Sequence, residues 1–164
     1  MIERSLVLLK PDTIQRALIG DIIKRFEQRG LKIVGMKMQW IDENFAKKHY
    51  TDDIEKRHSK MVRDKLLRYI ISGPIVALVL EGIDAISIVR KIVGSTYPNE
   101  APVGTIRGDF AHMSKLYADS SDKTNIKNLI HASGNKEEAE QEINLWFKKE
   151  ELHSYKTVHD LHIF

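Results

Sequence analysis

Apolar residues occur along the chain in two patterns, continuous runs and strict alternation with polar residues. A continuous run is typical of a strand buried on both faces, and the run at residues 75–80 predicts a central strand. Alternation is typical of a half-buried strand. Met36, Met38 and Trp40 follow it, so we expect their shared face to lie against a core. The sequence predicts four strands, over residues 5–10, 34–40, 75–80 and 127–131.

Segments with helical period separate these strands. In each, apolar residues recur every three or four positions and form one face. Several boundaries carry residues typical of helix ends, such as Gly30 and Gly94 after a helix and Asp84 and Asn135 before one. The sequence predicts helices over residues 19–29, 42–50, 54–71, 86–93 and 136–147.

The order of these elements predicts the fold class. Strand, helix, strand, helices, strand, helix, strand and helix give a βαββαβ order, which indicates an α+β, ferredoxin-like fold with helices covering an antiparallel sheet. A chain of 164 residues is too short for two ordinary domains, so one domain is expected over 1–164. Residues 94–124 form a long irregular stretch, and a C-terminal extension is expected over 148–164.

Composition and charge narrow the functional classes. The chain contains no cysteine, which excludes disulfides, cysteine zinc sites and a thiol nucleophile. Its net charge of +3 is scattered along the chain, which suits a phosphate-bearing ligand better than a nucleic-acid-binding tail. There is no signal-peptide pattern and no apolar stretch long enough to span a bilayer, so we expect a cytoplasmic protein without a membrane partner.

Of the seven histidines, His131 has the context most typical of a reactive residue. It ends an apolar strand and is followed by small residues that leave room for a ligand. A neutral imidazole is available near neutral pH and forms covalent intermediates directly. A structural histidine bonded to the backbone is the alternative.

Glu142 is a candidate partner for this imidazole. It lies at the border of the apolar face of the last predicted helix, and a carboxylate near a core needs a partner. His131 or Ser133 on the adjoining strand would supply one. A glutamate that simply reaches solvent from the rim remains the alternative.

A group of cations and hydroxyl groups lies at element ends and in loops. Arg107 stands between two glycines in Gly-Thr-Ile-Arg-Gly-Asp-Phe at 104–110, where backbone and guanidinium could both approach a phosphate. Arg90, Thr96 and Lys10 add to this group. The alternative for each of them is an ordinary role at the protein surface or at a helix end. Together they offer what an anionic ligand needs.

At these residues the chain resembles the nucleoside diphosphate kinases. The most specific segments are 104–110 and Asn-Leu-Ile-His-Ala-Ser at 128–133, and Glu142 follows at the family's spacing. Further matching segments lie at 10–12, 20–27, 48–50, 72–74 and 90–96, so the resemblance covers nearly the whole chain. It implies a ferredoxin-like fold and a homo-oligomer, with a hexamer expected and a tetramer as the alternative.

The resemblance also implies a reaction. His131 would carry a phosphoryl group in a ping-pong cycle that moves the γ-phosphoryl of ATP to other nucleoside and deoxynucleoside diphosphates. Glu142 and Ser133 would hold the imidazole, and Tyr50 would border it.

The resemblance assigns the remaining binding roles as well. Lys10 and Asn128 would contact ribose hydroxyls and phosphates, and Arg90, Thr96 and Arg107 would bind phosphates. The metal ion, Mg²⁺, would arrive on the nucleotide phosphates, so no dedicated metal site is expected.

The chain departs from the family pattern in two segments near these residues. The stretch between residues 50 and 72 is longer than usual, and the aromatic residue that stacks on the base has no clear counterpart. Val62 is the expected replacement. An insertion is expected at about 111–124.

Two other functional classes compete with this reading. An RNA-binding module would share the ferredoxin-like layout, but the aromatic consensus of such modules is absent, so no dedicated nucleic-acid site is expected. A catalytically inactive interaction subunit would share the family's fold. Every expected phosphate and histidine position is filled here, which favours an active enzyme.

Overall fold

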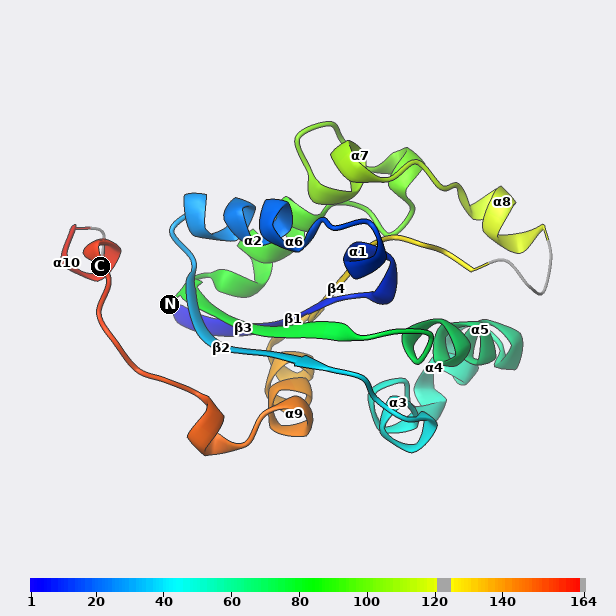
Figure 1. Ribbon diagram of the computed structural model, residues 1–164, viewed down its shortest axis with the longest axis horizontal. Coiled ribbons are helices and arrows are strands. Elements are labelled where there is room, and N and C mark those ends of the chain that lie inside the picture. The colour runs from blue at the N-terminus through cyan, green and yellow to red at the C-terminus, as the bar shows by residue number, and fades with distance from the viewer. Residues whose placement is uncertain (121–124, 163–164) are drawn as a thin grey trace.

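The computed structural model describes residues 1–120 and 125–162 and contains a four-stranded antiparallel sheet. The strand order is β2-β3-β1-β4, so the first and third strands occupy the centre (Figure 1). This is the ferredoxin-like arrangement that the order of elements predicts. The strands are β1 (Ile2–Leu9), β2 (Lys32–Gln39), β3 (Ile75–Ile83) and β4 (Ile130–Ala132).

Helices cover both faces of the sheet, with α2 and α6 on one side and α3 and α9 on the other (Figure 1). The remaining helices extend the layers at the ends. The longer helices are α2 (Ile19–Gln28), α3 (Glu43–His49), α4 (Asp52–Arg57), α5 (Lys60–Ile70), α6 (Ala85–Val93) and α9 (Lys136–Trp146). The short ones are α1 (Pro11–Gln15), α7 (Ile106–Phe110), α8 (Lys115–Asp119) and α10 (Val158–His162), with 3₁₀ turns η1 (Pro98–Glu100) and η2 (Lys149–Glu151).

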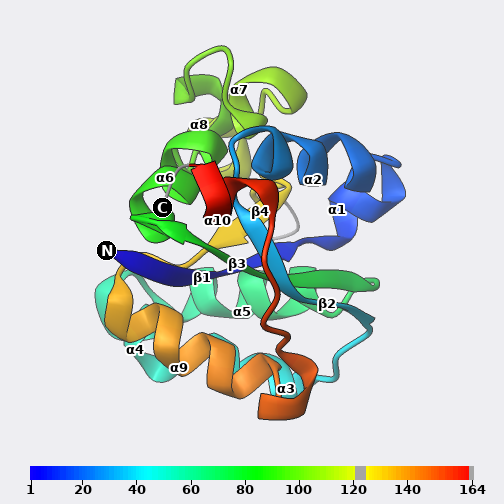
Figure 2. The same ribbon diagram turned by 90° about the vertical axis from the view of Figure 1, so that its left-hand side faces the viewer.

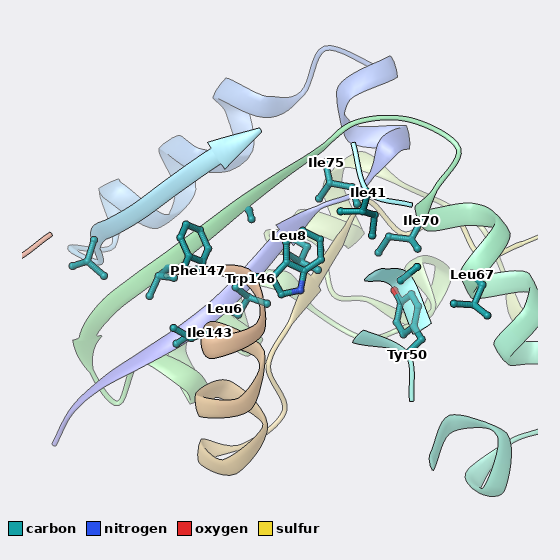
Figure 3. Close-up of a cluster of buried hydrophobic side chains, with 14 residues drawn as sticks. Leu6, Leu8, Ile41, Tyr50, Leu67, Ile70, Ile75, Ile143, Trp146 and Phe147 are labelled. Carbon is teal, nitrogen blue, oxygen red and sulfur yellow. The ribbon is translucent and has the colours of Figure 1, made fainter. Parts of the chain in front are cut away.

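The alternation of side chains along β1 divides the core into two clusters. Leu6 and Leu8 face α9, whereas Val7 and Leu9 face α2 and α6. Figure 3 shows the first cluster, where Trp146 and Phe147 from the end of α9 pack across the strands. Since β1 and β3 are buried on both faces, their continuous apolar runs are explained.

Strand β2 contradicts the expected alternation. Its pairing with β3 shifts between Ile33 and Gly35, and after this irregularity the side chains change faces. Met36 and Met38 are each 59% exposed and Trp40 is 68% exposed, so these residues do not face a core within this chain. The prediction was wrong because a one-residue slip moves every later side chain to the other face.

Two helix predictions also need correction. The helix expected over 54–71 is divided into α4 and α5, because Ser59 caps α5 by accepting a hydrogen bond from the Val62 amide at 3.2 Å. Asp84 stands at the start of α6 but makes no side-chain cap; its carboxylate instead accepts from the amino terminus. The caps expected from Gly30, Gly94 and Asn135 are present.

The irregular stretch contains two short helices, α7 and α8. The last four residues of the expected insertion, 121–124, lie outside the described residues, as do 163 and 164. The C-terminal extension turns back and runs past β2 (Figure 2), where the His153 amide donates to the Val34 carbonyl at 2.7 Å. Over the described residues, no helix has the length and apolar character needed to cross a bilayer.

Candidate active site

A cleft of about 1120 Å³ opens between α3–α5 on one side and the loop after α6 on the other. That volume is ample for a nucleotide-sized ligand. Nine of the ten candidate residues line the cleft: Lys10, Tyr50, Val62, Arg90, Thr96, Arg107, Asn128, His131 and Glu142. The tenth, Ser133, is fully buried beside it. Residues far apart in the sequence therefore share one cavity.

His131 lies on β4, opposite Leu8 of β1 in the antiparallel ladder. Directly paired residues point to the same face, so the imidazole projects towards α9 with Leu8. Its side chain is 22% exposed, and Nε2 lies 2.7 Å from Oε1 of Glu142. The carboxylate can only accept, so Nε2 carries the proton and Nδ1 keeps the lone pair. Of the two ring nitrogens, Nδ1 is therefore the one whose lone pair could attack an electrophile.

Glu142 is held by two partners at once. Its second oxygen accepts a hydrogen bond of 2.6 Å from the Ser133 hydroxyl. Burial raises the pKa of this carboxyl, but His131, His49 and Ser133 together outweigh that effect and leave the pKa below its usual value. Glu142 is therefore ionised at neutral pH and can stabilise positive charge on the imidazole.

The backbone just before His131 is strained and held by several hydrogen bonds. Leu129 has a φ of +68°, which is costly for a residue with a side chain. Its carbonyl accepts from the Lys10 amide at 2.8 Å and from the Thr13 hydroxyl at 2.6 Å, and its amide donates to Asp12 at 3.1 Å. The turn at the start of α1, with Pro11 in the first helical position, thus fixes the approach to His131.

Lys10 brings a buried amino group into the cleft. Its Nζ donates to the Asn128 side-chain oxygen at 2.7 Å, and the Asn128 amide donates to the Thr96 carbonyl at 2.9 Å. Burial, helped by the charge of Arg107, lowers the pKa of Lys10 to about 7. An anion bound here would restore the charge on Lys10.

Most of the N–H groups of the Arg107 side chain donate hydrogen bonds to the protein's own backbone. Its guanidinium donates to four backbone carbonyls: Asn128 at 3.1 Å, Gly94 at 3.0 Å, Ser95 at 3.2 Å and Ile130 at 2.6 Å. One of its five N–H groups remains for a ligand. Burial and the charge of Arg90 lower its pKa to about 10, so it stays charged. Arg107 therefore joins the backbone segments that form this wall of the cleft, and it also faces the cavity.

The other candidates lie around these residues. Arg90, in the last turn of α6, and Thr96, in the following loop, are exposed on the cleft wall. Val62 is half-buried in the first turn of α5 and also lines the cleft. Tyr50 is 6% exposed, and burial raises the pKa of its hydroxyl, so it remains protonated.

The sequence reasoning missed His49. Its ring stands edge-on to His131, with centroids 4.8 Å apart, and its Nδ1 accepts a 3.4 Å hydrogen bond from the Trp146 indole. Burial, and after it the electrostatic effect of His131, lowers the pKa of His49 to about 3, so the His49 ring is neutral. The helical period could have indicated this position, because His49 lies three residues after Ala46 and four after Phe45, and residues with this spacing share one face of a helix.

The described residues contain one cluster with the composition of a metal site: His49, His131 and Glu142, whose ligand atoms lie within 4.8 Å of one another. Two imidazole nitrogens and one carboxylate are a poor match for Mg²⁺, which prefers oxygen ligands and keeps several waters. The cluster is better explained by the hydrogen bonds described above.

Comparison with known proteins agrees with this arrangement. The family model described as "Nucleoside diphosphate kinase" matches residues 3–152. A nucleoside diphosphate kinase of Pyrococcus horikoshii is 51% identical over 158 residues, which cover 96% of this chain and 93% of the relative. One from Borreliella burgdorferi is 45% identical over 157 residues, covering 95% and 93%.

Solved structures give the same result. A transition-state mimic of the nucleoside-diphosphate kinase from Borrelia burgdorferi, with bound vanadate and ADP, has a TM-score of 0.94 at 44% identity and covers 97% of this chain and 95% of that one. A halophilic nucleoside diphosphate kinase from Halobacterium salinarum in complex with CDP has a TM-score of 0.84 at 38% identity, covering 100% and 99%. With the histidine, its carboxylate and the surrounding cations in one cleft, the chain belongs to the nucleoside diphosphate kinase family.

Proposed function

We propose that His131 is the residue on which this phosphotransferase carries the phosphoryl group. In the first half-reaction, Nδ1 attacks the γ-phosphorus of ATP; the N–P bond forms, the bridging P–O bond breaks, and ADP leaves with its electrons. In the second, a terminal oxygen of another nucleoside diphosphate attacks, and the N–P bond breaks. The 2.7 Å contact between His131 and Glu142 in a cation-lined cleft is the observation that carries the proposal.

The chain's own groups supply two effects in this scheme. The Glu142 carboxylate stabilises the positive charge that the ring gains when Nδ1 bonds to phosphorus, while Ser133 holds the carboxylate in place. Lys10, Arg90 and Arg107 neutralise the phosphates, and Asn128 and Thr96 add polar contacts to phosphate or ribose. Tyr50, whose ring centroid lies 4.7 Å from that of His49, would border this end of the cleft.

Enzymes of this class generally need a divalent metal, and we propose that here it is Mg²⁺ carried on the nucleotide phosphates. The described residues offer no oxygen-rich set near His131 that would suit a resident Mg²⁺ ion. When bound, the ion supplies charge neutralisation on the phosphates. The protein groups named above act on the remaining charge.

We also propose that the chain functions as one domain in the cytoplasm and as a homo-oligomer, with a hexamer expected. Met36, Met38 and Trp40 support the assembly, because they expose an apolar surface along β2, an edge strand in the described sheet. A second copy of the chain packed against this surface would remove these apolar side chains from water.

Labelling with γ-³²P-ATP tests the proposed intermediate. We expect an acid-labile, base-stable label on the wild-type protein, its release by unlabelled nucleoside diphosphates, and no label on His131→Ala. A wild-type protein that takes up no label would instead support an inactive interaction subunit. Tight RNA binding without nucleotide turnover would support the RNA-binding alternative.

A further inference from the structure

The amino group of Lys10 has surroundings unlike those of the other lysines in the cleft. Among the described residues, those others are Lys48, Lys65 and Lys115. Lys48 is exposed to solvent, whereas Lys10 is only 5% exposed. The Lys10 amino group donates to the Asn128 side-chain oxygen at 2.7 Å, and the centroid of the Tyr69 ring lies 5.5 Å away. Both of these neighbours are neutral, so no carboxylate in the described part of the chain bonds to this buried nitrogen.

This setting favours the neutral amine over the ammonium form. Burial, and after it the positive charge of Arg107, lowers the pKa of Lys10 to about 7, although the Asp12 carboxylate opposes the shift. At pH 8 roughly nine in ten Lys10 side chains are therefore neutral, against fewer than about one in a hundred for an ordinary lysine. A neutral amine keeps its lone pair free and can act as a nucleophile.

The residues suited to phosphate lie next to this amine, on either side of Asn128. The Arg107 guanidinium donates to the Asn128 carbonyl at 3.1 Å, while Lys10 bonds to the side chain of the same residue. The Asn128 side chain also bonds to the Thr96 carbonyl, and the charge of Arg90 acts on Arg107. A phosphoryl group held by the two arginines would therefore place its substituent close to the Lys10 nitrogen.

The nature of that substituent decides which chemistry is possible. In a nucleotide it is another phosphate group, which Lys10 can only bind. In an acyl phosphate it is a carbonyl carbon, one oxygen away from phosphorus, and an amine can attack this carbon. We propose that Lys10 is a site of covalent acylation by acyl phosphates that enter the cleft in place of a nucleotide.

The reaction needs no further reactant. The neutral nitrogen attacks the carbonyl carbon and a C–N bond forms, while the C–O bond to phosphate breaks. Phosphate leaves with the electron pair and takes up the proton that the nitrogen loses. The product is a neutral amide, so the cleft loses one cation and should bind nucleotides more weakly. The proposal uses the anion-binding residues alone and does not require the phosphohistidine.

Labelling with ¹⁴C-acetyl phosphate tests the proposal, with His131→Ala as the test protein so that the imidazole cannot take part. Peptide mapping after reaction at pH 8 should find Lys10 labelled at least roughly tenfold faster than Lys48, the exposed lysine of the same cleft. Lys10→Arg should lose this label, and ADP should prevent it. Equal rates at Lys10 and Lys48, or labelling of Lys10 that ADP does not reduce, would overturn the proposal.

The pH dependence identifies the reacting amine. At low acetyl phosphate the rate follows the ionisation of the free protein, so labelling of Lys10 should rise with a midpoint near pH 7 and level off above it. Near pH 7 Arg107 stays charged while Tyr69 and His49 stay neutral, so the midpoint reports Lys10. The bound dianion raises this pKa, and the midpoint should move upward at saturating acetyl phosphate. A rate at low acetyl phosphate that still increases at about pH 10, as for an ordinary lysine, would overturn the proposal.

Arg90→Ala, made in the His131→Ala protein, tests delivery by the phosphoryl group. It should slow labelling of Lys10 by acetyl phosphate roughly tenfold, because a charged contact to the phosphoryl group is lost. Acetic anhydride has no phosphoryl group, and its reaction with Lys10 should stay within about twofold of the rate without the Arg90 substitution. Equal slowing with both reagents would overturn delivery through the phosphate. Wild-type protein that is acylated at Lys10 but takes no label from γ-³²P-ATP would refute the phosphohistidine and support this proposal.

Discussion

Replacement of Glu142 by glutamine separates the charge of this carboxylate from its position. The glutamine oxygen can still accept from His131 Nε2, where the present distance is 2.7 Å, while its amide donates to the Ser133 oxygen. A hydrogen bond to a charged group contributes about 1.5–3 kcal/mol, against about 0.5–1.5 kcal/mol for a neutral one. The variant should therefore lose about 1–2 kcal/mol of transition-state stabilisation.

In rate, this loss corresponds to a decrease of roughly 5- to 30-fold in the formation of phosphohistidine. Glu142→Ala also frees the imidazole and leaves Ser133 without its partner. We therefore expect a total loss of about 3–4 kcal/mol, or roughly 100- to 1000-fold. Rapid-quench measurement of single-turnover labelling by γ-³²P-ATP gives both rates. A glutamine variant as fast as wild type would refute the role of the charge, and equal rates for the two variants would refute the role of position.

Three further predictions test other parts of the site and the surface. The pKa of Lys10 is about 7 in the free protein, and a bound diphosphate should raise it, so binding at pH 8 should take up close to one proton and affinity should fall as pH rises above 7. Calorimetry in buffers of different ionisation enthalpy measures this proton uptake. A binding enthalpy that does not depend on the buffer would contradict the prediction. Arg107→Lys removes most of the four carbonyl contacts and should lower the free energy of unfolding by roughly 2–4 kcal/mol, so a wild-type urea midpoint would argue against the structural role. The double variant Met36→Glu, Met38→Glu should sediment as a smaller species than wild type, whereas an unchanged sedimentation coefficient would exclude this face from the assembly.

Much of the fold follows from periodicity, because a buried strand or helix face requires apolar residues at fixed spacing. The central position of β3 could be predicted in this way, and the helix ends at Gly30 and Asn135 could be predicted from residue types typical of caps. The outward face of β2 could not, since the shift between Ile33 and Gly35 depends on pairing with β3 and leaves no mark in the alternation itself.

For the site, the pairing of His131 with Glu142 could be predicted because helical geometry places the carboxylate at the edge of the buried face. His49 was missed since the charged residues around it hid its position on the same face as Ala46. The four carbonyl contacts of Arg107 were also beyond prediction, because they depend on the paths of two separate backbone segments.

The guanidinium of Arg107 bridges the loop after α6 and the strand that bears His131. Opening that bridge would release both segments while the central strands β1 and β3 stayed paired. On heating, the enzyme should therefore lose activity before it unfolds. Turnover should decrease at a temperature at which the far-ultraviolet circular dichroism of the sheet and main helices is unchanged.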